Sequence, residues 1–465
     1  MNPNSFSYFG FLALGALVHH LLPARGRRYW LLTWSLLFYW LCAGQVLWLL
    51  LATIAANYAL GRFAAGRKPV LVLGLLLNLG LLALLKYLGF FGELAAALGM
   101  GPLRLPSLIL PLGISFYTFV SCGYLIDVYR GTRPVETDPV DFALFVSFFP
   151  AILSGPIERA GHLLPQLKAL DRIDGEDLKF AVTRLITGLT KKVLLADTLA
   201  VLVNIAYGAP ERFTGLQLMV AAIAYSLQIY FDFSAYSEMA VGAARLFGVR
   251  LIENFRAPYL ARSAKEFWRR WHISLSTWFR DYLYFPLGGS RKGKARTWGN
   301  LLIVFACSGL WHGAAMHFVI WGLLCGAYQV AGGMTDPLRR RLHLPAPFQV
   351  LFTFALTTVS WIFFRADSAA QALYILGRIV TTAGVSFPLR LTELGLPAPK
   401  LWVAGIGSAV ILTAEALEER YGLRERLLHT VWLRDLLWVA MLIAVALFGA
   451  YGTGYNAQEF VYFQF

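Results

Sequence analysis

The sequence predicts an all-α membrane protein that crosses the bilayer many times. Hydrophobic residues make up 58% of the 465 residues and charged residues only 14%, well below the roughly 25% that soluble domains carry. Apolar runs recur from end to end with no long polar linker between them, and a chain that spans lipid must form helices or a closed barrel. We therefore expect a single multi-helix membrane domain over residues 1–465, with about eleven transmembrane helices.

The basic residues predict the orientation of the first helices. The formal net charge of +15 would also suit a nucleic-acid-binding protein, but most Lys and Arg residues lie in short loops, as the positive-inside rule predicts for cytoplasmic loops. Arg27 and Arg28 directly follow the first apolar run. We therefore expect the N-terminus outside the cytoplasm, a retained first helix instead of a cleaved signal peptide, and no nucleic-acid partner.

The expected spans follow from the apolar runs in chain order. The segment 29–60 is long enough for two short helices hinged near Gly44. The segment 142–157 contains Ser147, Pro150 and Pro156, too many breaks for a helix exposed to lipid, so a re-entrant or protein-buried segment is expected there. The remaining spans are expected at residues 8–22, 70–85, 108–126, 182–207, 217–246, 300–330, 348–364, 401–416 and 436–451.

The stretch 245–294 mixes charged and aromatic residues and is unlike a spanning helix. Ser263 and Glu266 form an S-x-x-E capping box, which predicts an amphipathic helix behind it. On that helix one face would carry four apolar side chains, Phe267, Trp271, Leu275 and Trp278. The basic run 291–296 would end this interfacial layer at the cytoplasmic surface.

His312 is the strongest candidate for a reaction centre. It lies in the membrane-like run 307–315, and histidine is rarely placed in hydrocarbon for packing alone. Gly309 and Gly313 would let another backbone or a substrate approach the ring, and Trp311 offers a flat apolar wall. A neutral imidazole could accept a proton from a hydroxyl, as a general base does; the alternative is a core histidine bonded to a carbonyl.

His272 is a second candidate. The equally open alternative is that it is an ordinary polar residue of an interfacial helix. His317 is expected to be structural, because five residues along a helix turn it roughly 140° away from His312. We expect no metal, since neither HExxH nor a suitable His/Cys cluster occurs. The motifs of serine esterases and P-loop ATPases are also missing.

The polar run 230–238 interrupts apolar sequence with carboxylates, hydroxyls and aromatic rings. Asp232, Ser234 and Tyr236 are the expected contacts to a sugar or a polar acyl carrier. The equally open alternative is the lining of an aqueous cavity or a polar contact between helices.

These residues resemble the membrane-bound O-acyltransferase (MBOAT) superfamily, and within it the branch of bacterial alginate O-acetyltransferase membrane subunits. The resemblance is most specific through the run from Glu266 to His272. It covers the chain nearly end to end, in residues 111–119, 148–150, 154–157, 230–238, 253–255, 266–289, 309–314, 361–366 and 460–465.

The resemblance implies a multi-pass protein of the bacterial inner membrane, with re-entrant segments and a buried tunnel. It implies an acyl donor on the cytoplasmic side, acetyl-CoA, with no bound cofactor, and an extracytoplasmic polysaccharide such as alginate or a separate SGNH-type acetyltransferase as partner. His312 matches the near-universal histidine of the superfamily and His272 the second histidine of the bacterial branch. We expect Trp271, Trp311 and Arg280 to contact substrate.

Three alternatives remain at this point. Within the superfamily, the protein would transfer D-alanine to teichoic acid or acetylate peptidoglycan; small residues at Ala257 and Ala261 and a short loop after Arg133 depart from the pattern on the acceptor side. The third is a polysaccharide or lipid transporter. A transporter would predict inverted repeats and paired broken helices, which the sequence does not contain.

Overall fold

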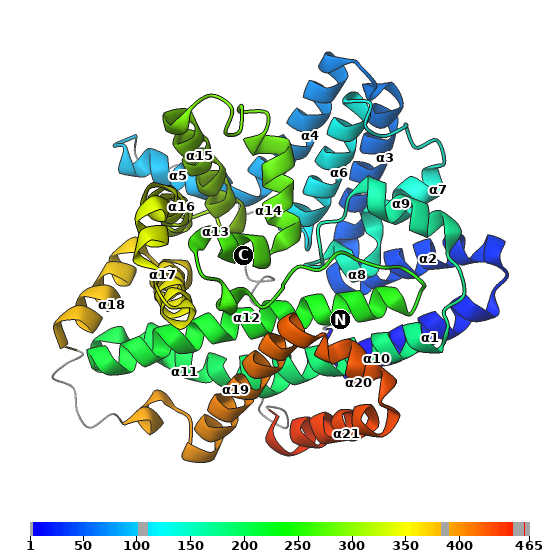
Figure 1. The fold of residues 1–465 in the computed structure, drawn as a ribbon. Coiled ribbons are helices and arrows are strands. Elements are labelled where there is room, and N and C mark those ends of the chain that lie inside the picture. The colour runs from blue at the N-terminus through cyan, green and yellow to red at the C-terminus, as the bar shows by residue number, and fades with distance from the viewer. Residues whose placement is uncertain (1–2, 101–109, 383–389, 450–459, 461–465) are drawn as a thin grey trace. The chain divides into compact units, whose positions relative to one another are not determined.

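The computed structural model describes residues 3–100, 110–382, 390–449 and 460, and within them every regular element is helical (Figure 1). The chain divides into two compact units. The first unit comprises Met1–Leu185 and Tyr236–Glu253, and the second comprises Ile186–Ala235 and Asn254–Phe465. The all-α class is confirmed, whereas a single domain over 1–465 stays a prediction.

The first unit is built from short and medium helices. In chain order they are α1 (Phe6–Leu21), α2 (Ala24–Ala43), η1 (Gly44–Val46), α3 (Leu47–Ala64), α4 (Lys68–Lys86), α5 (Leu88–Ala97), α6 (Ile114–Tyr129), α7 (Pro139–Ser147), α8 (Phe149–Ile152), α9 (Ala160–Ala169) and most of α10 (Gly175–Thr190).

The second unit holds most of the long helices. In chain order, the described elements of this unit are the π-helical turn η2 (Lys191–Ala196), α11 (Asp197–Gly208), η3 (Pro210–Arg212), α12 (Gly215–Arg245), η4 (Pro258–Leu260), α13 (Ala264–Arg270), α14 (Ile273–Phe279), the π-helical turn η5 (Arg280–Tyr284), α15 (Lys294–His312), α16 (Met316–Leu342), α17 (Ala346–Arg365), α18 (Ala369–Thr382), η7 (Leu391–Leu394), α19 (Ala398–Tyr421), α20 (Leu423–His429) and α21 (Val431–Phe448). The C-terminal end of α12 belongs to the first unit.

Seven helical segments of the described chain are long and apolar enough to cross a membrane, so the protein is a multi-pass membrane protein. They are Ala24–Ala64, Lys68–Lys86, Gly215–Arg245, Met316–Pro337, Ala346–Arg365, Ala398–Tyr421 and Val431–Phe448. Two further apolar helices, α1 and α6, have 16 residues each. The expected count of about eleven is therefore not confirmed.

Several expected spans match the helices closely. The segments expected at 70–85, 217–246, 348–364 and 401–416 correspond to α4, α12, α17 and α19. The hinge expected near Gly44 is present, because η1 separates α2 from α3 and Gly44 has a φ of 59°. The ends of the spans expected at 108–126 and 436–451 lie partly outside the described residues.

The span expected at 300–330 is wrong, because the chain forms two helices there. Helix α15 ends at His312 and α16 begins at Met316. Gly313 and Ala315 are both extended, with φ values of −156° and −150°, so the backbone leaves the helix directly after His312. The sequence pattern missed this break because the apolar residues continue through it.

The segment 142–157 is enclosed by protein, as one of the two expected alternatives stated. It forms the end of α7 and the short α8, and nearly all of its residues are buried. Gly113, at the start of α6, has a φ of 74°, and a Cβ there would overlap the carbonyl oxygen of Ile152. A glycine is therefore needed where α6 meets this segment.

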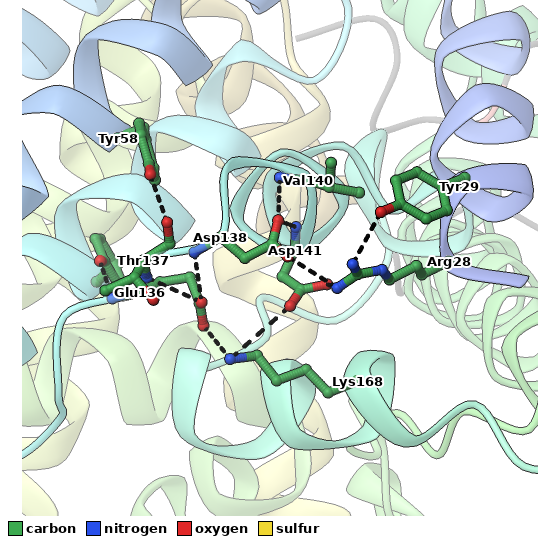
Figure 2. A network of polar contacts seen from close by, with 10 residues as sticks. Arg28, Tyr29, Tyr58, Glu136, Thr137, Asp138, Val140, Asp141 and Lys168 are labelled. Atoms are coloured by element: carbon green, nitrogen blue, oxygen red, sulfur yellow. Dashed lines mark hydrogen bonds and ion pairs between the residues drawn. The ribbon is translucent and has the colours of Figure 1, made fainter. Parts of the chain in front are cut away.

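A network of charged side chains joins α2, α7 and α9 in the first unit (Figure 2). Arg28 of α2 binds Asp138 at 2.8 Å and Asp141 at 3.4 Å. Lys168 of α9 binds Glu136 at 2.7 Å and lies 3.9 Å from Asp141. Asp138 also caps the N-terminus of α7. Both basic side chains are partly exposed, so each single pair contributes modestly, and the network acts by orienting the three helices.

Candidate active site

Two buried histidines lie close together in the second unit. His312 is the last residue of α15, and His272 precedes the first turn of α14. Their side chains are 3% and 0% exposed, and their ring centroids are 6.3 Å apart. The sequence singles out the same two residues in separate motifs, and the fold brings them together.

Glycines set the position of His312. A Cβ at Gly309 would overlap the carbonyl oxygen of Phe318, and one at Gly322 would overlap that of Phe305. Helices α15 and α16 therefore pack backbone against backbone, as small residues allow within membranes. The expected close approach beside His312 is thus made by another helix.

Aromatic rings surround His312. The ring centroids of Trp311, Trp321 and Phe364 lie 4.8, 5.1 and 5.4 Å from that of His312, and all three side chains are buried. Such an apolar surrounding excludes water and strengthens any hydrogen bond made by the imidazole. It is an environment that suits a neutral base.

The backbone at His272 is unusual and corrects the expected amphipathic helix. His272 has a φ of 42° and a ψ of 56°, in the left-handed region, so α13 and α14 are separate helices. Left-handed residues other than glycine persist where their surroundings hold them, and they often occur at functional sites. The N-terminal half of the capping box is confirmed, because Ser263 accepts a hydrogen bond from the backbone N–H of Glu266 at 3.2 Å.

Asn254 holds the start of α14 in place. Its side-chain oxygen accepts hydrogen bonds from the hydroxyl of Ser274 at 2.6 Å and from the backbone N–H of Ser274 at 3.3 Å. Its backbone carbonyl accepts from the N–H of Ile273 at 2.9 Å. These three bonds fix the backbone of the two residues directly after His272.

Two aromatic side chains lie close to the His272 ring. The ring of Phe233, from α12, meets it edge to face at 4.7 Å, and that of Trp311 lies 6.0 Å away. His272 lies outside the candidate membrane spans. Burial lowers its pKa to about 3, so the ring is neutral near pH 7 and can take part in hydrogen bonds without carrying a charge.

Of the other expected substrate contacts, two tryptophans lie beside the histidines, whereas two polar residues bind groups of the protein itself. Trp311 touches both histidines, and Trp271 packs against Trp361 at 4.9 Å beside them. Asp232 and Ser234 are buried but face partners within the protein. The Asp232 carboxylate binds Lys192 at 2.7 Å, and the Ser234 hydroxyl donates to the carbonyl of Phe231 at 3.5 Å.

Tyr236 and Arg280, the two remaining expected contacts, differ in their surroundings. Tyr236 is buried within the first unit. The Arg280 side chain is 53% exposed and binds the neighbouring Asp281 at 2.8 Å. Their expected roles as substrate contacts stay predictions.

Several residues that shape this region have no role in the prediction from sequence. Phe233, Asn254 and Phe364 lie in the runs 230–238, 253–255 and 361–366 that carry the family resemblance, but no role was predicted for them individually. Trp321 carries no signal that stands out in a single sequence. Lys192 did offer one, because a lysine in apolar sequence needs a partner. Within the described part of the chain, no group of three or more His, Cys, Asp or Glu side chains is arranged to hold a metal ion.

Comparison with known proteins identifies the class to which this chain belongs. Residues 133–366, half of the chain, match the MBOAT, membrane-bound O-acyltransferase family. Both histidines lie inside the matched range. The chain belongs to this family, and the protein is a membrane O-acyltransferase.

Individual relatives narrow the comparison. The chain is 38% identical over 442 residues to the "Probable alginate O-acetylase AlgI" of Pseudomonas putida, covering 90% of this chain and 86% of that protein. It is 40% identical over 383 residues to the protein of the same name from Pseudomonas aeruginosa, covering 78% and 72%. It is also 34% identical over 417 residues to the "Peptidoglycan O-acetyltransferase" of Helicobacter pylori, covering 81% and 79%.

Proposed function

We propose that this enzyme transfers an acetyl group from cytoplasmic acetyl-CoA toward hydroxyl groups of an extracytoplasmic polysaccharide such as alginate, within the bacterial inner membrane. The observation that carries the proposal is the buried pair of His272 and His312, with ring centroids 6.3 Å apart and aromatic walls. The extensive identity to the two alginate O-acetylases supports the choice of acyl group and polymer.

The proposed chemistry needs one base and a dry site. Neutral His312 takes the proton of the acceptor hydroxyl as that oxygen attacks the thioester carbonyl. The C–S bond then breaks, an ester forms, and the proton passes from the imidazolium to the leaving CoA thiolate. The surrounding aromatic side chains keep out water, which would otherwise hydrolyse the thioester.

We assign His272 a different role, which is to orient the donor or the acceptor. Its burial keeps it neutral, and the fixed backbone around it suits a residue that holds a group in place. Trp271 and Trp311 would form the walls against which the acyl group lies. A direct acceptor polymer and a separate SGNH-type acetyltransferase are both compatible with this arrangement.

The proposal is tested by acyl transfer in inner-membrane vesicles that contain the enzyme. The donor is [¹⁴C]acetyl-CoA, offered with alginate oligosaccharides, and the product is ester-bound label released by mild alkali. The His312→Ala variant should lose about a hundred- to ten-thousand-fold in rate at an unchanged membrane content. His317→Ala is the matched control, since the proposed chemistry gives His317 no role and its ring packs against that of Phe318 at 4.3 Å, and it should keep the normal rate.

Two results would overturn the proposal. Near-normal transfer by His312→Ala would exclude His312 as the base. Transfer of label to the acceptor from a D-alanyl donor, with no transfer from acetyl-CoA, would exclude acetyl transfer. Peptidoglycan O-acetylation is the second candidate because of the Helicobacter pylori relative, and peptidoglycan fragments in place of alginate oligosaccharides decide between the two polymers.

A further inference from the structure

A buried charged cluster lies in the second unit and has no part in the proposed proton transfer. It consists of Lys191, Lys192, Asp197, Asp232 and Glu415. The ammonium of Lys192 is 2.7 Å from the Asp232 carboxylate and 2.9 Å from that of Asp197. All three side chains are at most 3% exposed, and the ring of Phe460 covers the ammonium at 4.3 Å.

The π-helical turn η2 sends two adjacent lysines to different helices. Lys192 reaches Asp232 on α12, whereas Lys191 binds Glu415 on α19 at 2.9 Å. The second carboxylate oxygen of Glu415 accepts a hydrogen bond from the hydroxyl of Tyr230, also on α12, at 2.7 Å. One turn of α12 is therefore held at two points, and π-helical turns are frequent at functional sites.

That same turn of α12 bears on the His272 segment. The ring of Tyr230 lies 6.0 Å from that of Trp271, and the ring of Phe233 lies 4.7 Å from that of His272. Asp232 lies directly before Phe233 in the chain. A shift of Asp232 relative to η2 would therefore move the aromatic edge that packs on His272.

Stability alone does not explain this cluster. Burying an ion pair costs about as much as its attraction returns, and well-packed apolar residues often serve as well or better. Here two carboxylates face Lys192, which adds a further cost. Charged groups in such a position are more readily explained by the geometry that they impose.

We propose that Lys192 is a positioning residue for His272: by binding Asp232, it fixes the turn of α12 that packs Phe233 against the His272 ring. The proposal rests on the acyl transfer proposed above. Misplacing a reacting or orienting group by about 1 Å can cost on the order of 100-fold in rate, so the main effect is expected in kcat.

The test compares Lys192→Met with His272→Gln and with the double variant, using purified enzyme, [¹⁴C]acetyl-CoA and alginate oligosaccharides. Lys192→Met should lower kcat by about 10- to 100-fold and raise the donor KM no further than His272→Gln does. The double variant should be no slower than His272→Gln alone, because the effect of Lys192 passes through His272. Arg27→Met is the control: it removes a buried cation from the first unit and should leave kcat per folded enzyme unchanged.

Losses that multiply in the double variant would overturn the positioning role, and so would a rise in donor KM with normal kcat. If His312→Ala retains activity, the proposed role of His312 as the base fails instead, which separates the two proposals. Where Lys192→Met does not insert, Asp232→Asn and Phe233→Leu replace it. The first keeps the Lys192–Asp197 pair and the second keeps every ion pair, and both should lower kcat without adding to His272→Gln; normal kcat in both would refute the role of Lys192.

Discussion

The rings of His272 and His312 are 6.3 Å apart, centroid to centroid, and Trp311 touches both of them. His312 ends a long helix, whereas His272 sits at a left-handed break between two short ones. The two imidazoles thus lie in one region but are held by different backbone elements. A substrate group that reaches both rings would contact His312 as the proposed base and His272 as the proposed orienting residue.

Replacing each histidine with glutamine should separate these roles. Glutamine keeps a hydrogen-bonding arm but cannot act as a base near neutral pH, so His272→Gln should retain partial transfer while His312→Gln should retain none above background. Acetyl-CoA binding, measured on the same preparations, should weaken for His272→Gln only. Complete loss of transfer in both variants with unchanged binding would place His272 in the chemical step.

The contact between α15 and α16 gives a second prediction. Gly309→Ala places a Cβ on the Phe318 carbonyl, so the helices must separate and His312 must move. We expect a destabilisation of about 1–3 kcal/mol, typical of overpacking, together with a loss of activity. Gly299→Ala on the same helix is the matched control, because no atom lies within 4 Å of its added Cβ. Equal thermal unfolding of the two variants in detergent would contradict this account.

Cysteine labelling from each side of the membrane tests the orientation. Arg67, Arg130 and Arg291 are expected at the cytoplasmic face, and Gly99 at the opposite face. The backbone N–H of Gly66 donates to the carbonyl of Tyr129 at 3.3 Å, which already places the loops after α3 and α6 side by side. Single cysteines at 67, 99 and 291, in a variant without the native cysteines, should label from the expected sides. Labelling of 99 and 291 from the same side would contradict the expected orientation.

His162 predicts a pH-dependent term in the stability of the first unit. A hydrogen bond with Glu158 at 2.7 Å raises the pKa of His162 above its usual value of 6.5. The stabilisation is therefore complete below that value and is lost as pH rises through the folded-state pKa. Thermal unfolding in detergent should show a fall in melting temperature as pH rises above about 6.5 that His162→Gln removes. An unchanged slope in the variant would assign the pH dependence to other groups.

The sequence predicted the long apolar helices well because their signal is local. Helices such as α12, α17 and α19 need only a run of apolar residues and a length that spans the bilayer. Breaks held by tertiary contacts could not be predicted in this way. The run from Glu266 to Trp278 contains no glycine or proline, yet the chain turns at His272, where Asn254 from a preceding loop holds the next residues.

The candidate site was predictable to a similar extent. His312 and His272 stand out because imidazole in apolar sequence calls for an explanation, and Trp311 and Trp271 are their chain neighbours. Asp232 was found as well, but its partner was not. The pairing with Lys192 joins residues far apart in the sequence, and one sequence carries no information about which buried charge meets which.

The paired amides of α3 and α4 bear on how this protein enters the membrane. Asn57 and Asn78, both buried, exchange reciprocal hydrogen bonds at 3.0 and 2.7 Å. An amide carried alone into hydrocarbon would leave its carbonyl oxygen without a donor, at a cost of several kcal/mol. Each amide thus donates the hydrogen bond that the other's carbonyl oxygen needs. The pair of helices α3 and α4 should therefore leave the translocon at lower cost than either helix alone. We therefore expect helices α3 and α4 to partition into lipid together, as one unit of biogenesis.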